Sequence, residues 1–242
     1  MLTAELLSIL VPVYNEAGTV AQVIERLRTI DLPVPREIVV VDDGSTDGTR
    51  EVLDDLAGRD ATLRVIHAEV NAGKGAAVRM GLAAARGTII AIQDADLELD
   101  PAQLAALVAP VLSGTASVVY GSRFLAGRPS APLITLAANI TLTAVTNLLY
   151  RSRLTDMETC YKIMRVGVAR QLQLESNGFD IEPEITAKLL RNGHTITEMA
   201  VVYVARRRVD GKKIKWRDGI RALRVLVGYR FGARSSRGSV KS

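Results

Sequence analysis

Hydrophobic and polar positions alternate in regular blocks along the first half of the chain. Short runs rich in Val and Ile are typical of buried strands, and apolar residues three or four positions apart predict helices. The strands predicted in this way are 6–13, 37–41, 63–67, 88–93 and 116–120. The helices predicted between them are 17–30, 46–56 with Ser45 as its N-cap, 75–85 and 101–112. This alternation predicts an α/β fold with a mostly parallel sheet and helices on both of its faces.

The pattern changes in the second half of the chain. Residues 129–150 carry no charged side chain and have the length of a membrane span. Two prolines and several Thr, Ser and Asn residues favour instead one or two amphipathic helices that lie on a membrane or cover a site. An ordinary buried helix pair is an equal alternative. A helix over 181–190, ended by Gly193, and a strand over 195–204 are predicted next.

The last predicted helix lies within residues 212–231 and has an apolar stripe. Trp216, Ile220, Leu223 and Val227 fall on one side of it, because they are spaced at i, i+4, i+7 and i+11. Arginines on the same helix make it basic as well as amphipathic, which is typical of helices that bind membrane surfaces. A terminal helix that packs on the body of the protein is the alternative.

Charge divides the chain into an acidic body and a basic end. Residues 205–242 carry 13 Lys and Arg against 2 Asp, a formal charge of +11, whereas residues 1–204 carry 18 Lys and Arg against 24 acids, a charge of −6. Basic ends commonly bind phosphates of nucleic acids, lipids or nucleotides. An acidic body with 4% aromatic residues argues against a nucleic-acid partner, since base stacking needs aromatic side chains. Residues 232–242 are predicted to be a disordered basic tail.

The cysteine content and the first residues of the chain limit the possible disulfides, zinc sites and cellular location. The single cysteine, Cys160, excludes an internal disulfide and a zinc cluster. Residues 1–5 lack the basic segment and following apolar run of a secretory signal, so we expect a cytoplasmic location.

Candidate chemistry gathers at the predicted strand ends. Asp94 and Asp96 close the apolar run 88–93, and two carboxylates so placed cannot both enter an apolar core. Such a pair suits a hard divalent cation, which Glu98 could also ligate and which could hold a diphosphate. Ligands of parallel sheets bind at the carboxyl ends of the strands. The loops after the first three strands are polar too: Tyr14-Asn15-Glu16, Asp42-Asp43-Gly44-Ser45 and Asn71-Ala72-Gly73-Lys74-Gly75.

Several motifs of the chain resemble a known family. In the first half they are PVYNEA (12–17), DDGSTDGT (42–49), NAGKGAAVRMG (71–81), DADLELDP (94–101) and YGSRF (120–124). These are similar to the inverting nucleotide-sugar glycosyltransferases of family 2, which have the GT-A fold with its Rossmann-like sheet. In the second half the motifs are DMETCYKIMR (156–165), NGFDIEPEI (177–185) and RRRVDGKKIKW (206–216). These resemble the dolichol- and polyprenyl-phosphate sugar synthases, that is, the dolichol-phosphate mannose synthase group. The resemblance implies one GT-A catalytic domain over 1–231, with 129–150 and 212–231 as membrane or acceptor elements.

The resemblance also implies where a nucleotide-sugar donor binds. Gly44 and Gly48 would let the backbone pass close to the nucleotide. Lys74 begins a helix whose N–H groups, with the lysine itself, are available to an anion. The basic residues near 206–213 would form a loop that closes over the diphosphate, since guanidinium groups fit phosphate oxygens. The implied donor-binding residues are Pro12, Tyr14, Glu16, Asp43, Lys74, Asp94, Arg206, Arg208, Lys212 and Lys213.

A metal site and a catalytic set follow from the same resemblance. Asp94, Asp96 and Glu98 match positions that bind Mg²⁺ or Mn²⁺, although the family often has Gln where this chain has Glu98. The implied catalytic residues are Asp96, Asp156 and Arg123, of which Arg123 faces the acceptor phosphate. The implied sugar and acceptor residues are Arg123, Glu182 and Glu184. The two glutamates contact sugar hydroxyls or brace the basic loop, with a merely structural role for one of them as the alternative.

The implied activity is transfer of a hexosyl group from GDP-mannose or UDP-glucose to a polyprenyl or dolichyl phosphate, with inversion. Without a convincing membrane-spanning helix, the enzyme is expected to attach to the cytoplasmic face of the membrane peripherally or through a membrane-protein partner. A family 2 enzyme with a polysaccharide, protein or metabolite acceptor is the alternative. A sugar nucleotidyltransferase is disfavoured, because its early phosphate loop is basic and Gly-rich whereas PVYNEAGT is acidic.

Overall fold

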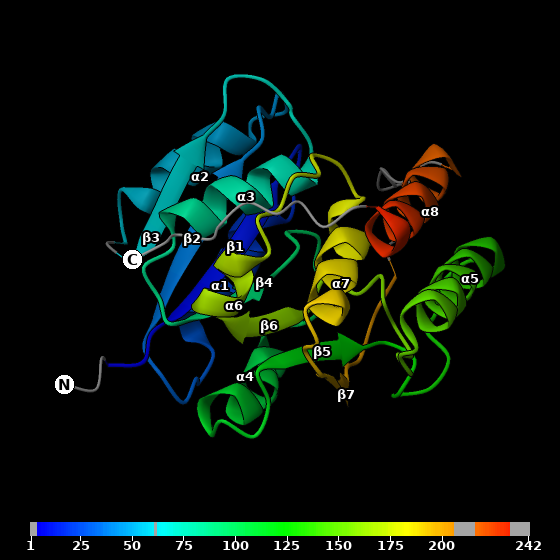
Figure 1. Ribbon diagram of the computed structural model, residues 1–242. Helices are drawn as coiled ribbons and strands as arrows, with labels where there is room; N and C mark the ends of the chain where they lie inside the picture. The colour runs from blue at the N-terminus through cyan, green and yellow to red at the C-terminus, as the bar shows by residue number, and fades with distance from the viewer. Residues whose placement is uncertain (1–3, 61, 206–215, 233–242) are drawn as a thin grey trace, which may run out of the picture.

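The computed structural model describes residues 4–60, 62–205 and 216–232 (Figure 1). The seven strands in these ranges form one sheet in the order β3-β2-β1-β4-β6-β5-β7. Neighbouring strands are parallel except at β6, which runs antiparallel between β4 and β5. The strands are β1 Leu7–Val13, β2 Arg36–Asp42, β3 Leu63–His67, β4 Ile89–Ile92, β5 Val118–Ser122, β6 Lys162–Arg165 and β7 Ile196–Ala200.

Helices cover both faces of this sheet, as the sequence pattern predicted. One core contains apolar residues of α1, α2 and α4, and the other contains those of α3, α6 and α7. The helices are α1 Val20–Thr29, α2 Thr49–Ala57, α3 Lys74–Ala84, α4 Leu104–Leu112, α5 Leu133–Tyr150, α6 Val166–Gln171, α7 Ile181–Arg191 and α8 Trp216–Phe231, with a 3₁₀ turn at Pro101–Gln103 before α4. The α/β class with a mostly parallel sheet is therefore confirmed.

The central strands are continuous apolar runs because they are buried on both faces. Ile9 of β1 lies between Ile38 of β2 and Ala91 of β4, and all three are fully buried in one core. The next residue, Leu10, points to the opposite core. The register of β1 thus fixes where β1, β2 and β4 end, and it brings the loops that follow them to one edge of the sheet.

Strand β6 and helix α6 were missed by the sequence analysis, and the start of the second helix was predicted too early. Strand β6 was not predicted, because it has four residues and begins with the charged Lys162, which is fully buried and paired with Glu182. The second helix was expected to begin after Ser45, but it begins at Thr49, after Gly48 in a left-handed conformation. The Ser45 hydroxyl instead accepts a hydrogen bond from the backbone N–H of Asn15 in the preceding loop.

Helices α5 and α8 lie side by side at the edge of the molecule far from β3 (Figure 1). The uncharged stretch 129–150 forms one helix, α5, and not two. Within the described residues α5 is the one helix long and apolar enough to cross a membrane, and 22% of its span is buried inside the protein. Part of α5 packs with α7 and α8 in a third, smaller core.

Candidate functional site

The loops after β1 and β2 are tied to each other by hydrogen bonds between backbone and side chains. The N–H of Asn15 donates to Ser45 Oγ at 2.9 Å, and the Asn15 side-chain oxygen accepts from the N–H of Thr46 at 2.8 Å. The N–H of Glu16 donates to Thr49 Oγ1 at 2.9 Å. Because short polar side chains fix the backbone of both loops, the predicted donor residues in them share one preorganised surface.

Asp43 extends this surface to the loop after β3. Its two carboxylate oxygens accept from the N–H groups of Ala72 at 2.9 Å and Gly73 at 2.7 Å, and the side chain is buried. The loops approach so closely that a Cβ on Gly44, which has φ +70°, would lie 2.8 Å from the backbone N of Asn71. The freedom of Gly44 therefore serves the packing of the two loops.

Lys74 lies beneath the Asp94 loop and has little access to solvent. Its Nζ is 2.8 Å from Asp94 Oδ1 and 3.0 Å from Glu182 Oε1. Burial alone would lower the pKa of Lys74, but Asp94 and Glu182 raise it above its usual value, so the amine stays charged.

The N-terminus of α3, where Lys74 lies, is covered by the loop before α7. The N–H of Ala76 donates to the carbonyl of Asn177 at 3.1 Å, and a Cβ on Gly75 would lie 2.3 Å from the carbonyl oxygen of Ser176. The N–H of Ala76 is therefore already engaged by the protein, and Lys74 braces the Asp94 loop. The predicted anion contact of Lys74 stays a prediction.

A chain of buried charges continues from Lys74 into the protein. Glu182 lies between Lys74 and Lys162, whose Nζ is 2.7 Å from Glu182 Oε2. The Lys162 amine also donates to the carbonyls of Met157 and Thr159. Burial raises the pKa of Glu182, but the two lysines outweigh it and hold the pKa below the usual value. Glu182 thus pairs two buried cations, a role that the sequence analysis did not foresee.

Glu184 is also engaged by protein groups. Its carboxylate accepts from the N–H groups of Glu175 and Ser176 at 2.9 and 2.7 Å and from the Tyr229 hydroxyl at 2.9 Å. Lys188 Nζ lies 2.6 Å away, and Glu184 is fully buried. These contacts give Glu184 a structural role that joins α7, α8 and the loop before α7, which is the structural alternative for one of the two glutamates.

The three predicted metal ligands point in different directions. Asp94 pairs with Lys74, Asp96 Oδ1 accepts from the N–H of Glu98 at 3.1 Å, and Glu98 Oε2 accepts from the Tyr203 hydroxyl at 2.8 Å. Among the described residues no group of three or more His, Cys, Asp or Glu side chains is arranged to hold a metal ion. Asp94 and Asp96 still offer oxygens of the type that Mg²⁺ and Mn²⁺ prefer, and oxygens of a bound diphosphate would complete such a set.

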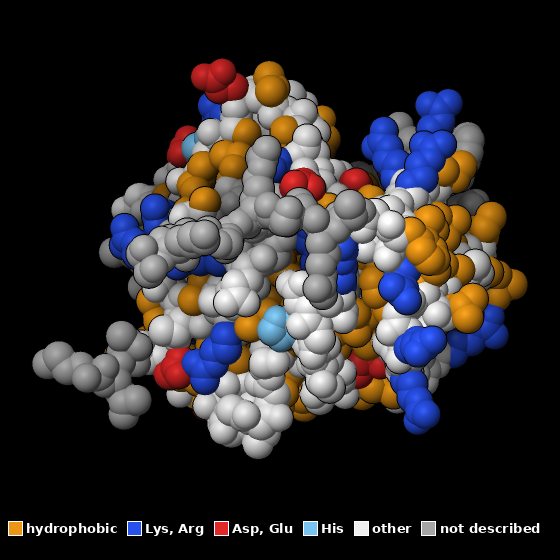
Figure 2. All heavy atoms as spheres, in the orientation of Figure 1, with side chains coloured by type: hydrophobic (Ala, Val, Ile, Leu, Met, Phe, Trp, Pro, Cys, Tyr) orange, Lys and Arg blue, Asp and Glu red, His pale blue; other side chains and the backbone are white. Residues whose placement is uncertain are grey.

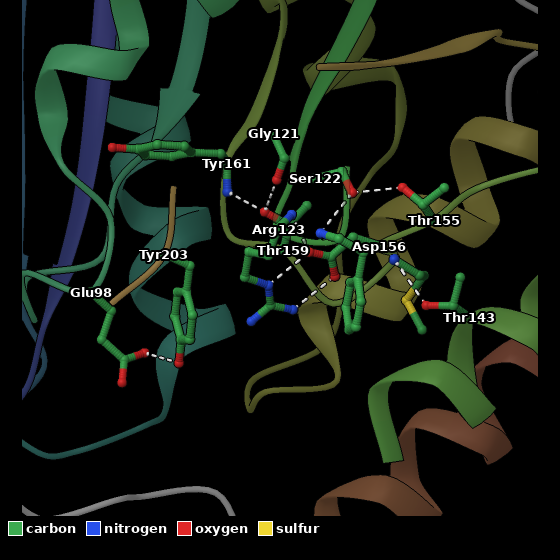
Figure 3. A network of polar contacts seen from close by, with 12 residues as sticks. Glu98, Gly121, Ser122, Arg123, Thr143, Thr155, Asp156, Thr159, Tyr161 and Tyr203 are labelled. Carbon is green, nitrogen blue, oxygen red and sulfur yellow. Dashed lines mark hydrogen bonds and ion pairs between the residues drawn. The ribbon is translucent and has the colours of Figure 1, made fainter. Parts of the chain in front are cut away.

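Arg123 and Asp156 form a bidentate ion pair, drawn in Figure 3. The guanidinium donates from Nε at 2.7 Å and from Nη2 at 2.8 Å, and the N–H of Arg123 donates to the same carboxylate. Asp156 is fully buried, and its own N–H donates to Glu198 at 2.9 Å. Burial would lower the pKa of Arg123, but Asp156 raises it, so the guanidinium stays charged. Two of the predicted catalytic residues are thus in direct contact.

Tyr203 joins this pair to the Asp94–Asp96 loop. The guanidinium of Arg123 lies 5.3 Å from the centre of the Tyr203 ring, and the hydroxyl of Tyr203 donates to Glu98 (Figure 3). The N–H of Val204 also donates to the carbonyl of Glu98 at 2.9 Å. The sequence analysis missed Tyr203, because the contact bridges 105 residues and no local spacing announces it.

Glu158 is a second residue that the sequence analysis missed. Its Oε1 is shielded from solvent and has no hydrogen-bond partner among the described residues. Burial raises the pKa of this carboxyl to about 7, although Lys162 opposes the rise. One signal was available in the sequence, namely three charged residues, Asp156, Glu158 and Lys162, within a short segment that also holds Met157.

The remaining predicted residues divide into two groups. Pro12 lies in β1 opposite Val41, directly before the polar loop that carries Tyr14. The basic residues near 206–213 fall outside the described ranges, as does the tail from 233. Those outside residues are Arg206, Arg208, Lys212 and Lys213.

The apolar helix α5 is fixed to the loop that carries Asp156. Thr143 Oγ1, near the middle of α5, accepts from the N–H of Met157 at 3.1 Å (Figure 3). Asn147, one turn further, bonds the backbone of Leu154 through both its amide nitrogen and its oxygen. The apolar helix therefore lies directly against the loop that carries Asp156.

A mostly parallel sheet with polar loops beyond β1, β2 and β4 defines a GT-A glycosyltransferase fold. Solved structures of glucosyl-3-phosphoglycerate synthase from Mycobacterium tuberculosis have the same fold. The complex with phosphoglyceric acid gives a TM-score of 0.71 at 20% identity and covers 93% of this chain and 80% of that one. Another, with Mn²⁺, uridine diphosphate and glucosyl-3-phosphoglycerate, gives 0.70 at 20% identity and covers 96% and 82%.

The chain belongs to glycosyl transferase family 2, whose model matches residues 8–172. It is 30% identical over 210 residues to the dodecaprenyl-phosphate galacturonate synthase of Rhizobium johnstonii, covering 83% of this chain and 59% of that protein. It is also 30% identical over 217 residues to the undecaprenyl-phosphate mannosyltransferase of Micrococcus luteus, covering 84% and 85%. The chain thus spans under two thirds of the first relative and most of the second.

Proposed function

We propose that this protein transfers a hexosyl group from a nucleotide-diphosphate sugar to a polyprenyl phosphate, with inversion at the anomeric carbon. GDP-mannose and UDP-glucose are the two donors to test first. The names of the Rhizobium and Micrococcus relatives support a polyprenyl-phosphate acceptor. The observation that carries the proposal is the contact between an apolar, largely exposed helix and the loop that holds the buried Arg123–Asp156 pair.

This contact suits an acceptor that is both anionic and lipidic. The planar guanidinium of Arg123 keeps N–H donors beyond the two that bind Asp156, and these match phosphate oxygens. The helix α5, which is bonded to the Asp156 loop, exposes apolar side chains that include Ile134 and Ile140. A prenyl chain would lie along such a surface while Arg123 orients its phosphate.

The chemistry follows from charge. A phosphate oxygen of the acceptor is already anionic at neutral pH, so the attack needs no strong general base. Arg123 holds the attacking oxygen, and Asp156 fixes the guanidinium in one orientation. In-line attack forms the new bond to the anomeric carbon as the bond to the nucleoside diphosphate breaks. When bound at Asp94 and Asp96, Mg²⁺ or Mn²⁺ would offset charge on that leaving group.

We also propose that α5 and α8 attach the enzyme peripherally to the cytoplasmic face of a membrane. Figure 2 shows hydrophobic side chains gathered at the side of the molecule where α5 and α8 lie, with Lys and Arg side chains around them. On α8 the exposed apolar residues share one side of the helix, and exposed arginines flank them. Because Thr143 and Asn147 bond to the body, α5 is suited to lie in the interface.

The test is a transfer assay with purified protein, a short polyprenyl phosphate, Mg²⁺ or Mn²⁺, and GDP-mannose and UDP-glucose in separate reactions. Glycolipid and free nucleotide are both measured. We expect glycolipid from one donor, which would also identify the sugar. Nucleotide release without glycolipid would move the acceptor to a polysaccharide, a protein or a metabolite, the alternative within this family. Recovery wholly in the soluble fraction, with no binding to anionic vesicles, would favour that alternative as well.

A further inference from the structure

A cavity of about 500 Å³ lies where α5, α7 and α8 end, apart from the candidate catalytic edge. It is within the volume range of small-ligand sites in proteins. Its described lining includes three arginines, two tyrosines and no carboxylate: Arg151, Arg191, Arg230, Tyr150 and Tyr229. Tyr150 lies seven residues beyond Thr143 along α5, a rise of about 10 Å, and Arg151 begins the connection that later carries Asp156.

The arginines of this cavity keep most of their hydrogen-bonding capacity. Arg230 Nε donates to the carbonyl of Leu149, and Arg191 donates to the carbonyls of Tyr229 and Gly232, so each helps to cap a helix end. A guanidinium has five N–H donors, and these contacts use one and two of them. The side chain of Arg151 is exposed, and its guanidinium has no hydrogen bond to another described residue. Within the described residues, the three guanidinium groups lining the cavity therefore keep N–H donors that an anion could accept from.

The rim of the cavity is apolar. Leu148 and Phe231, the chain neighbours of lining residues, are 81% and 72% exposed. Both lie on the exposed apolar sides of α5 and α8, because successive helix residues are rotated by about 100° and the exposed apolar residues of each helix share one sector. Cationic lining beside an exposed apolar surface matches one kind of ligand: a phosphate attached to a lipid at the membrane surface.

We infer that this cavity binds the phosphate headgroup of an anionic phospholipid and thereby sets how the enzyme sits on the membrane. The inference rests on the proposed membrane attachment and names its lipid contact. Arg151 and Arg230 would bind the phosphate oxygens, Arg191 would support them, and Leu148 and Phe231 would enter the acyl layer. The acceptor phosphate remains assigned to Arg123, a separate site.

The test uses soluble short-chain phosphatidic acid, below its micelle concentration, as a calorimetric probe. We expect saturable one-to-one binding to the wild type and a loss of about tenfold or more in affinity in the Arg151→Gln/Arg230→Gln double variant. The matched control is Arg153→Gln/Arg224→Gln, which removes the same charge from exposed residues outside the cavity. We expect its affinity to stay within about twofold of wild type, because screened surface charges act weakly on a small soluble ligand.

Three outcomes would overturn the inference. Equal losses in the two double variants would mean that general surface charge attracts the lipid. No saturable binding would mean that the cavity holds no headgroup. Equally tight binding of inorganic phosphate would mean a free-phosphate site. Melting temperatures check that the variants fold, and transfer to a short polyprenyl phosphate in detergent separates failure of this inference from failure of the proposed function.

Discussion

The candidate donor edge and the candidate acceptor region of this protein are built by different means. At the donor edge, side chains of loop residues bond the backbone of the next loop, as Asp43 bonds Ala72 and Gly73. In the acceptor region, buried charged side chains hold one another, as Asp156 holds Arg123 and Glu182 holds Lys162. The first arrangement depends on short polar residues at strand ends, and the second depends on contacts between distant segments.

This difference has a consequence for how each region responds to mutation. A backbone-bonded loop loses about 1 kcal/mol when one side-chain hydrogen bond is removed, since others remain. Removing one partner of a buried ion pair leaves an uncompensated charge, and that change is several times larger. We therefore expect the acceptor region to tolerate substitution less than the donor edge, whereas substitution of Asp94 or Asp96, the proposed metal ligands of the donor edge, should affect chemistry and not folding.

The largest effect is expected at the donor edge for Asp96→Ala. Loss of the carboxylate that would hold the cation removes several kcal/mol of stabilisation from the developing diphosphate charge, so transfer should fall on the order of 10³-fold. The measurement is the transfer rate across a Mg²⁺ or Mn²⁺ titration, with the melting temperature as a check on folding. Full activity of this variant in the presence of a chelator would contradict the assignment of a metal to Asp96.

A smaller loss is expected in the acceptor region for Asp156→Asn. The amide keeps one acceptor for the guanidinium of Arg123 and turns an N–H₂ group toward it, so the arginine loses its fixed orientation. We expect kcat/KM for the acceptor to fall about 10- to 100-fold, since truncation of one partner in a buried pair is worth about 2–5 kcal/mol, part of which appears in folding.

Asp55→Asn is the matched control for that change. Asp55 forms an exposed ion pair with Arg59, so the same substitution should change neither stability nor transfer beyond about 1 kcal/mol. Donor binding separates the two regions, because Asp156→Asn should leave it intact. Equal losses for donor and acceptor would mean that the regions are one cooperative unit.

The same contrast explains which features the sequence predicted. The strands and helices from 6 to 124 were placed within a few residues, because periodic burial and strand-end polar loops are local signals. Arg123 and Asp156 were singled out through resemblance to a family, and the structure brings them together. Strand β6 was missed, because a lysine at its first position breaks the apolar pattern of a buried strand.

The partners of charged residues were harder to predict. Lys74 and Glu184 were expected to contact ligands, and in the structure Lys74 pairs with Asp94 after β4, whereas Glu184 pairs with Lys188 of its own helix. Tyr203 was not noticed, because its partners Glu98 and Arg123 lie far away in sequence. The spacing of residues in a sequence indicates which face of a helix or strand each residue lies on. It does not indicate which charged residues of distant segments form ion pairs.

Tyr203 links the two regions, and Tyr203→Phe tests whether the link matters. Removal of the hydroxyl takes away one hydrogen bond that orients Glu98, which is worth about 1 kcal/mol, so we expect a roughly fivefold rise in the metal concentration needed for half-maximal transfer. Tyr203→Leu also removes the ring beside Arg123 and should raise KM for the acceptor in addition. Identical kinetics for the two variants would show that the ring does nothing for Arg123.

Glu158 is expected to affect stability and not transfer. Its pKa is raised to about 7 from 4.5, so the folded protein binds a proton more tightly than the unfolded chain does. Stability from this proton is therefore fully present below about pH 4.5 and is lost as pH rises through about 7. At about 1.4 kcal/mol per pKa unit, the loss amounts to about 3 kcal/mol at most.

Glu158→Gln removes this titration and keeps the shape of the side chain. Urea unfolding at pH 5 and pH 8 should show wild type losing free energy of unfolding relative to the variant by about 1–3 kcal/mol as pH rises. The Glu51→Gln variant, at an exposed position of α2, should follow wild type at both pH values. If the free energy of unfolding of wild type and of Glu158→Gln changed equally between pH 5 and pH 8, Lys162 would already compensate the charge of the Glu158 carboxylate. The buried charges of the acceptor region would then all be paired.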